Sequence, residues 1–392
     1  MSQQLISLNQ DLKRLRDEGY HIEVHGGHLI VRHIPYVNSK REVKMGALVS
    51  TLCLSGNKTL KPDTHVMLFA GEQPCNKNGK VIQGIAHTNA NQRIKDDVVV
   101  QRQFSNKPKA GYGDYYEKVI TYANIISSPA KAIDASVTER PHLPIVATNE
   151  TANFKYFDTN SSRANISQLN NKFEGQKIAI IGLGGTGSYI LDLVAKTNVS
   201  EIHVFDGDEF LNHNAFRAPG APTIEQLDLR PSKVSYFSEI YSAMHNGIVQ
   251  HNYYVTDENM NELKEMDYVF LSLDNNQARN EIIQFLVTNS ISFADVGMGV
   301  QIVQDNVIGI VRVTSSEHGK MEHLQKRIPS VSTAVENEYV TNIQIAELNS
   351  LNAVLAVIKW KKMSGFYQDL EKEQHMTYSI NVSQLLNEDH AA

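Results

Sequence analysis

The sequence has few cysteines, and this scarcity excludes several classes of protein. Two cysteines in 392 residues cannot build a disulfide scaffold or a Cys-rich zinc site, so no zinc is expected. No stretch approaches the ~18 apolar residues of a membrane helix, and the first 19 residues carry charges where a signal peptide needs an apolar core. The 11 prolines and 23 glycines are too few for a fibrous chain. We therefore expect a globular, cytoplasmic protein with no membrane partner.

Basic residues are also too sparse for a nucleic-acid-binding protein. The formal net charge is −6; residues 1–150 hold 19 Lys and Arg against 14 Asp and Glu, and the remainder holds 18 against 29. Neither part has the density of positive charge that binds nucleic acid, so no nucleic-acid partner is expected. An acidic segment that binds phosphate must do so locally, with backbone N–H groups, a few cations and a metal ion.

The hydrophobic pattern predicts two domains. Residues 1–140 contain an amphipathic helix and two apolar-alternating runs around Gly26 and Gly27, which predicts a small α+β domain with a hairpin. Residues 141–162 are rich in Pro, Ser, Thr and Asn and predict a linker. In residues 163–392 strands alternate with helices, which predicts an α/β domain with a Rossmann-like, mostly parallel sheet and helices on both faces.

A glycine-rich turn follows the first strand of the second domain. The run KIAIIGLGGTGSYI places Gly182, Gly184 and Gly187 in the pattern G-x-G-x-x-G, with Gly185 inside the same turn. The glycines permit a tight turn, and the helix N-terminus that follows offers N–H groups to phosphate. Asp206 ends the next strand, where a carboxylate can bind a ribose hydroxyl. This motif predicts an adenine-nucleotide site and leaves an NAD-dependent oxidoreductase open.

Charged and amide residues after the later strands favour a free triphosphate over NAD. They are Asp206, Asp208, Asn214, Arg217, Lys233, Asp274, Asn275 and Arg279. A dehydrogenase needs no Arg and Lys here, whereas a reacting triphosphate needs cations to neutralise the negative charge that develops on it. Asp206 and Asp274 both follow strands, where ligands of parallel sheets bind, and an acid facing phosphates can hold Mg²⁺.

This ordered set resembles the adenylation domain of the ThiF family, which includes sulfur-carrier adenylyltransferases and the ubiquitin-activating enzymes. The resemblance covers roughly residues 160–360. It implies an ATP- and Mg²⁺-dependent adenylation of the C-terminal Gly carboxylate of a ubiquitin-like protein, with release of pyrophosphate. A relative that adenylates a small peptide or a sulfur carrier remains an alternative, as does a catalytically inactive scaffold.

The resemblance also implies roles for single residues. The glycine turn, Asp206, Asp208, Asn214 and Asn275 would bind the nucleotide; Arg217 and Lys233 would hold phosphates; Asp274 would ligate Mg²⁺. Members of the family are usually homodimers, so Arg163 would reach into the partner subunit's site; an ordinary solvated loop residue is the alternative. The apolar stretch 342–360 predicts a helix buried in the core or in that subunit interface. For Arg279, an ordinary structural salt bridge remains equally open.

The transfer step departs from the pattern of ubiquitin-activating enzymes, because no cysteine follows Cys75. Three routes remain open: transfer of the adenylate to a conjugating-enzyme-like partner, an oxyester on Ser330, Ser332 or Thr333, or a thioester on Cys75. Cys75 lies in a turn-like segment and is expected to be exposed, whereas Cys53 lies in an apolar run and is expected in the core. Similarity to bacterial ThiF proteins with an extra N-terminal domain implies a ubiquitin-like conjugation pathway and a role in antiviral defence.

Overall fold

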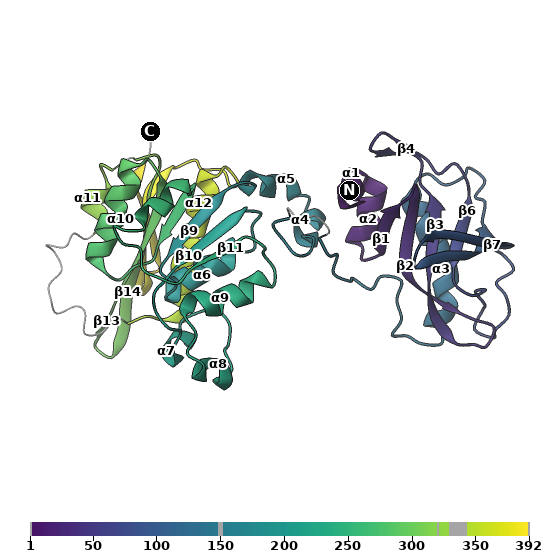
Figure 1. Ribbon diagram of the computed structural model, residues 1–392, viewed down its shortest axis with the longest axis horizontal. Coiled ribbons are helices and arrows are strands. Elements are labelled where there is room, and N and C mark those ends of the chain that lie inside the picture. The colour runs from purple at the N-terminus through teal and green to yellow at the C-terminus, as the bar shows by residue number, and fades with distance from the viewer. Residues whose placement is uncertain (1, 148–151, 320, 329–342, 391–392) are drawn as a thin grey trace. The chain divides into compact units, whose positions relative to one another are not determined.

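The computed structural model describes residues 2–147, 152–319, 321–328 and 343–390. The chain divides into two compact units, Met1–Ile145 and Val146–Ala392 (Figure 1). The finer domain limits inferred from the sequence stay a prediction. Within the described residues, every helix is too short or too polar to cross a lipid bilayer.

The first unit is a six-stranded antiparallel sheet packed against a helix. Its elements are α1 (Ser2–Leu8), α2 (Gln10–Asp17), β1 (His21–His25), β2 (His28–Val37), β3 (Val43–Thr51), β4 (Leu54–Ser55), β5 (Lys58–Thr59), β6 (Val66–Ala70), β7 (Ala86–Lys95), β8 (Val98–Ser105) and α3 (Tyr115–Lys131). The strand order is β1-β2-β3-β6-β8-β7. The predicted hairpin is confirmed: Gly26 and Gly27 both have positive φ, and His25 pairs with His28 across the turn. The apolar side of α3, which includes Val119, Tyr122 and Ile126, is buried in the core of this unit.

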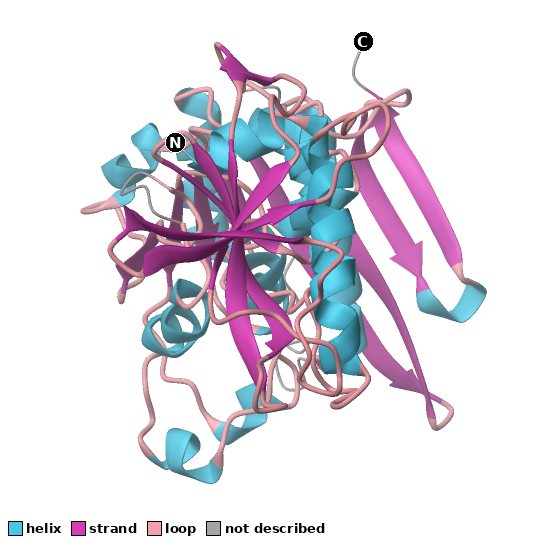
Figure 2. Cartoon of the chain, turned by 90° about the vertical axis from the view of Figure 1, so that its right-hand side faces the viewer, coloured by secondary structure: helices cyan, strands magenta, loops and turns pink. Residues whose placement is uncertain are grey.

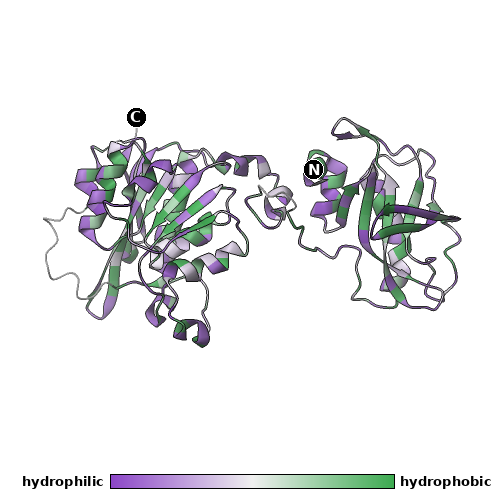
Figure 3. Cartoon of the chain, viewed as in Figure 1, coloured by the Kyte–Doolittle hydropathy of each residue, from purple (hydrophilic) through white to green (hydrophobic). Residues whose placement is uncertain are grey.

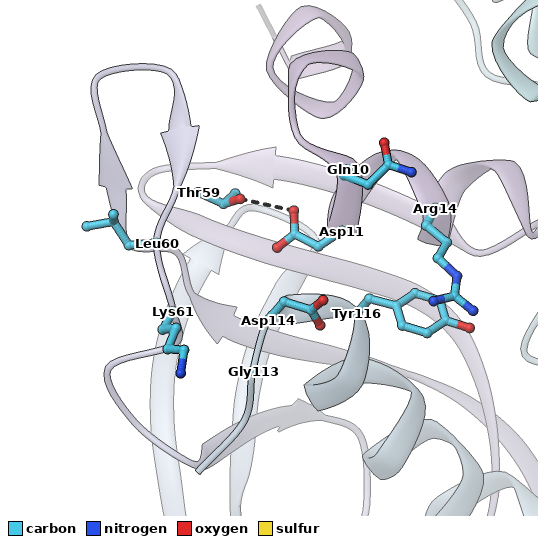
Figure 4. A pocket seen from close by; sticks show the side chains of 9 residues that line it. All are labelled: Gln10, Asp11, Arg14, Thr59, Leu60, Lys61, Gly113, Asp114 and Tyr116. Carbon is cyan, nitrogen blue, oxygen red and sulfur yellow. Dashed lines mark hydrogen bonds between the residues drawn. The ribbon is translucent and has the colours of Figure 1, made fainter. Parts of the chain in front are cut away.

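A cavity of about 420 Å³ lies beside α2, β5 and the N-terminus of α3 (Figure 4). Its polar groups hold the unit together. Asp11 accepts hydrogen bonds from the Thr59 hydroxyl at 3.0 Å and from the Tyr115 N–H at 3.2 Å. The Arg14 guanidinium lies 3.7 Å from the centre of the Tyr116 ring and pairs with Glu18. These contacts connect α2, β5 and α3. The polar side chains around the cavity therefore have structural roles in this unit.

The second unit contains the nucleotide-binding pattern. Its elements are α4 (Thr159–Arg163), α5 (Ser167–Asn170), η1 (Asn171–Phe173), β9 (Lys177–Ile181), α6 (Gly185–Val194), β10 (Glu201–Phe205), α7 (Asn212–Ala215), α8 (Ile224–Asp228), α9 (Lys233–Ser242), β11 (Ile248–His251), η2 (Met260–Glu265), β12 (Tyr268–Leu271), α10 (Asn276–Thr288), β13 (Ser292–Val303), β14 (Asn306–Ser316), α11 (Leu324–Arg327), α12 (Ala346–Met363), β15 (Glu373–Ser379), η5 (Ile380–Val382) and β16 (Gln384–His390).

Its eight-stranded sheet has the order β11-β10-β9-β12-β13-β14-β15-β16. The first five of these strands are parallel, and β14, β15 and β16 continue the sheet in antiparallel fashion. Figure 2 shows β15 and β16, joined by η5, at the outer edge near the C-terminus. The predicted mostly parallel α/β sheet, preceded by a smaller α+β unit, is confirmed.

Alternating side chains of the parallel strands bury both faces of the sheet. On β9, Ile178 and Ile180 pack into the cluster that contains residues of α6 and α12, while Ala179 and Ile181 pack into the cluster that contains residues of α10. Continuous apolar strands are typical of parallel sheets covered on both faces, and they are green in Figure 3. Helices on both faces leave the carboxyl ends of the strands as the place for a ligand.

Candidate nucleotide site

The turn between β9 and α6 has room only for glycine at two positions. Gly182 has φ +90°, and a Cβ there would lie 2.3 Å from the Ser272 carbonyl oxygen. A Cβ on Gly187 would lie 1.8 Å from the Gly182 carbonyl oxygen. Both approaches are far inside van der Waals contact, so the turn requires these glycines. The close approach of backbone to backbone at the start of α6 is the geometry that phosphate-binding turns use.

Asp206, just after β10, holds this turn in place. One carboxylate oxygen of the buried side chain accepts a hydrogen bond from the Leu183 N–H at 2.7 Å, and the other accepts one from the Asp208 N–H at 2.8 Å. Asp206 thus braces two backbone segments that border the site. Its predicted contact with a ribose is a further role that would use the remaining lone pairs of the carboxylate.

Lys233, at the start of α9, joins the two acids. Its buried ammonium nitrogen lies 2.6 Å from an Asp208 oxygen and 3.5 Å from an Asp206 oxygen. Tyr254 donates a hydrogen bond to the other Asp208 oxygen. Partial burial raises the pKa of Asp208, but the hydrogen bonds from Lys233 and Tyr254 outweigh it and hold this pKa below its usual value. The hydrogen bond to Asp208, followed by burial, raises the pKa of Tyr254 to about 12.

Arg217 lies on the loop after α7 and Asp274 on the loop after β12, close enough for their charges to interact. Burial lowers the pKa of the half-buried Arg217, and the charge of the exposed Asp274 opposes this shift. The Arg217 Nε is buried and has no hydrogen-bond partner among the described residues. A buried guanidinium N–H without a partner lacks the hydrogen bond that an anion could supply. This pair is therefore the second charged group beside the turn.

Two predicted nucleotide ligands have structural contacts of their own. The Asn214 side-chain oxygen accepts a hydrogen bond from the Leu211 N–H at 2.8 Å and so holds the first turn of α7. The Asn275 side-chain oxygen accepts one from the Ala278 N–H at 3.1 Å and caps α10. Each amide nitrogen is the group that would contact a nucleotide, and those contacts stay predictions.

Asn349 on α12 connects the glycine turn to Arg217. Its side-chain oxygen accepts a hydrogen bond from the Thr186 hydroxyl at 2.9 Å, and its nitrogen donates to the Arg217 carbonyl at 3.2 Å. The residue is fully buried, and a Cβ on Gly185 would lie 2.0 Å from the Asn349 nitrogen. The sequence reasoning missed Asn349, because it treated α12 as nearly all apolar. A polar side chain in an apolar helix was the available signal.

The sequence left open whether the helix predicted over 342–360 is buried in the core or in a subunit interface. In the structure, Ala353, Ala356, Val357 and Trp360 of α12 pack into the core of the second unit. This face of α12 therefore packs against the core of the same chain. The predicted homodimer stays a prediction.

The structure does not bring Arg163 into this cluster. Arg163 is exposed at the end of α4, and its predicted reach into a partner subunit's site stays a prediction. Ser330, Ser332 and Thr333, the candidate oxyester acceptors, lie outside the described residues.

The expected exposure of Cys75 is wrong. Cys75 is buried, whereas Cys53 is half-exposed. The backbone of Cys75 bridges Val37 and Val81 in antiparallel fashion, so the segment is an extended connection inside the unit. Burial and the nearby Glu72 carboxylate raise the pKa of the Cys75 thiol. Since the thiolate is the nucleophile, this environment disfavours Cys75 as an acyl acceptor.

A sequence profile of the ThiF family matches residues 159–358, which is more than half of the chain. The chain belongs to the ThiF family. It is therefore an enzyme of the adenylating type. A second profile, the domain of unknown function DUF6791, matches residues 10–159. No curated protein sequence matches the chain.

Three solved structures are similar to this ThiF-family chain. E. coli MccB with succinimide is 16% identical, and the match covers 57% of this chain and 67% of MccB with a TM-score of 0.46. E. coli MccB with ATP is 16% identical, with 58% and 67% covered and a TM-score of 0.45. Selenomethionine PaaA is 14% identical, with 57% and 75% covered and a TM-score of 0.44.

Proposed function

We propose that this ThiF-family chain uses ATP to adenylate the C-terminal carboxylate of a ubiquitin-like protein. The observation that supports this most is the charge arrangement at one end of the parallel sheet. Lys233 pairs with Asp206 and Asp208 in the segment after β10, and the charges of Arg217 and Asp274 interact with one another, while the nearby turn has glycine positions without room for a side chain. A site for NAD would have no need of these cations, whereas a triphosphate requires them.

The proposed reaction needs no side-chain nucleophile. An oxygen of the substrate carboxylate attacks the α-phosphorus of ATP, the bond to the bridging oxygen of pyrophosphate breaks, and pyrophosphate leaves with that electron pair. N–H groups at the start of α6 would orient the phosphates. Arg217 would neutralise the negative charge that develops on them, and Lys233 would do so by exchanging its contact with Asp208 for one with a phosphate. The buried position of Lys233 excludes much of the water that would screen its charge.

The residues present fit a magnesium ion brought in with ATP. Within the described residues, no three His, Cys, Asp or Glu side chains gather into a site that could hold a metal alone. Mg²⁺ in nucleotide sites needs only one or two carboxylates, because phosphates and water supply the other ligands. The exposed Asp274 would be the protein ligand. When bound, the ion would screen the charge of the phosphates.

The later steps of the proposal follow from the chemistry of the acceptors. Burial of Cys75 favours transfer of the activated carboxylate to a conjugating-enzyme-like partner over a thioester on this thiol. A homodimer would place Arg163 of each subunit near the other subunit's ATP. Such an enzyme would serve a bacterial ubiquitin-like conjugation pathway, in the cytoplasm and in antiviral defence.

ATP–pyrophosphate exchange tests the proposal. The full chain, ATP and Mg²⁺ are mixed with a candidate ubiquitin-like protein that ends in Gly, and separately with a peptide of its last residues. Exchange that needs the folded protein supports the proposal, and equal exchange with the peptide favours a peptide-adenylating enzyme instead. NADH binding in preference to ATP–Mg²⁺ would contradict adenylation altogether. Loss of exchange in Lys233→Met, with exchange kept in Lys326→Met as the matched control at an exposed lysine, would support this site.

A further inference from the structure

A buried arginine holds the loop that carries Asp274. Arg279 lies in the first part of α10 and is only 7% exposed. One terminal nitrogen of its guanidinium donates to the Leu273 carbonyl at 2.5 Å, immediately before Asp274. The other donates to the side-chain oxygen of Asn276 at 2.7 Å, two residues after Asp274. The guanidinium therefore donates hydrogen bonds to the residues on both sides of Asp274.

The guanidinium is itself anchored to the sheet. Its Nε lies 3.4 Å from an oxygen of Asp295, a fully buried carboxylate on β13. Arg312 on β14 lies 2.7 Å from the other Asp295 oxygen and donates to the Thr314 hydroxyl at 2.7 Å. A Cβ on Gly297 would lie 2.6 Å from the Arg312 guanidinium, so the strand makes room for it. Asp295 is thus held by a hydrogen bond from Arg312, and it attracts Arg279 by charge, without a hydrogen bond between the two.

We propose that Arg279 is a positioning residue that sets the place of the Asp274 carboxylate, and thereby the contribution of Mg²⁺ to ATP binding. This inference rests on the proposed function, in which Asp274 ligates the ion. Mg²⁺ demands near-ideal octahedral geometry, so its affinity depends on where a ligand is held. Groups that orient a metal ligand typically contribute 10- to 100-fold to metal affinity. Arg279 would act through the backbone, because it holds the residues on either side of Asp274 and not the Asp274 carboxylate itself.

The arginine fork cannot be replaced by lysine. Three nitrogens of Arg279 contact three different partners, whereas a lysine ammonium is a single point charge. Arg279→Lys keeps the positive charge beside the buried Asp295 but cannot make both hydrogen bonds to the loop. The variant therefore separates loop positioning from the neutralisation of a buried acid.

The experiment compares ATP affinity with and without magnesium, by calorimetric titration of the full chain. ATP is titrated once in EDTA and once in excess Mg²⁺, and the ratio of the two affinities is the magnesium gain. In Arg279→Lys we expect the EDTA affinity of the wild type and a magnesium gain reduced by about tenfold. Arg327→Lys is the control, because Arg327 pairs with Glu388 and Asp389 of β16. Its magnesium gain should equal that of the wild type.

Parallel variants separate the possible failures. If Asp274→Asn keeps the full magnesium gain, the magnesium part of the proposed function is wrong, and the inference falls with it. If Asp274→Asn loses the gain but Arg279→Lys keeps it, only the inference is overturned. A loss of affinity in EDTA as well would show a general structural role and would also overturn it. Should Arg279→Lys not fold, Asp295→Asn replaces it, with a reduced magnesium gain expected for the same reason.

Discussion

Paired substitutions at Asn349 and Gly185 test the connection between α12 and the glycine turn. Asn349→Ala leaves the Thr186 hydroxyl and the Arg217 carbonyl without a buried partner, at about 1–3 kcal/mol for each group. Gly185→Ala places a Cβ 2.0 Å from the Asn349 nitrogen, and such overpacking typically costs about 1–3 kcal/mol. In the double variant the new methyl group enters the space that the amide leaves. We therefore expect Gly185→Ala to destabilise the wild type but to be neutral or stabilising in Asn349→Ala.

The chain offers a specific probe for this cycle. Trp360 is the only tryptophan, it is 1% exposed, and it lies on the same helix as Asn349. Its fluorescence during urea unfolding therefore reports the free energy of unfolding of the second unit. The expected coupling between the two sites is about 1–3 kcal/mol, in the range measured for residues in contact. Equal effects of Gly185→Ala in the two backgrounds would refute the close approach on which the reasoning depends.

Three further predictions follow from contacts around and outside this site. Gly187→Ala should abolish ATP binding measured by calorimetry, because its Cβ would lie 1.8 Å from the Gly182 oxygen; near-normal affinity would contradict the turn geometry. The pKa of Asp208 is lowered in the folded state, so its stabilising effect is present above the usual carboxyl pKa and is lost as the pH falls through the lowered value. Lys233→Met removes the cation that lowers this pKa, so the variant should be less stable at neutral pH and should lose less stability on acidification, as followed by Trp fluorescence; an unchanged dependence of stability on pH would argue against this ion pair. Iodoacetamide should modify Cys75 only in denaturant, as mass spectrometry of digested protein can check; rapid modification of the native chain would show that the thiol is accessible.

The part of the site that the sequence predicts well depends on local geometry. Gly182, Gly187 and Asp206 lie within one strand–turn–helix–strand unit, whose spacing alone requires them to meet. Lys233 and Asp274 could be placed near them because parallel strands bring their carboxyl ends to one edge. The contact of Lys233 with Asp206 agrees with this expectation, and the part that these residues take in nucleotide binding stays a prediction.

The contacts that the sequence does not predict depend on packing between distant segments. Asn349 and Thr186 form a hydrogen bond although 163 positions separate them, and the hydrophobic periodicity of the sequence does not predict such a pair. Cys75 lies among turn-forming residues, but pairing with Val37 and Val81 carries its side chain inward. The turn-forming residues around Cys75 predict a turn correctly. They do not predict which neighbouring segments bury the thiol.

The contacts of Asn349 with the start of α6 have a consequence for the order in which the site forms during synthesis. When residue 200 leaves the ribosome, β9, the turn and α6 already exist as a stretch of chain, but their partner on α12 is still unsynthesised. The hydrogen bonds of Asn349 to Thr186 and to the Arg217 carbonyl therefore form only after translation has passed position 349, and a prematurely terminated chain would hold the glycine motif without them.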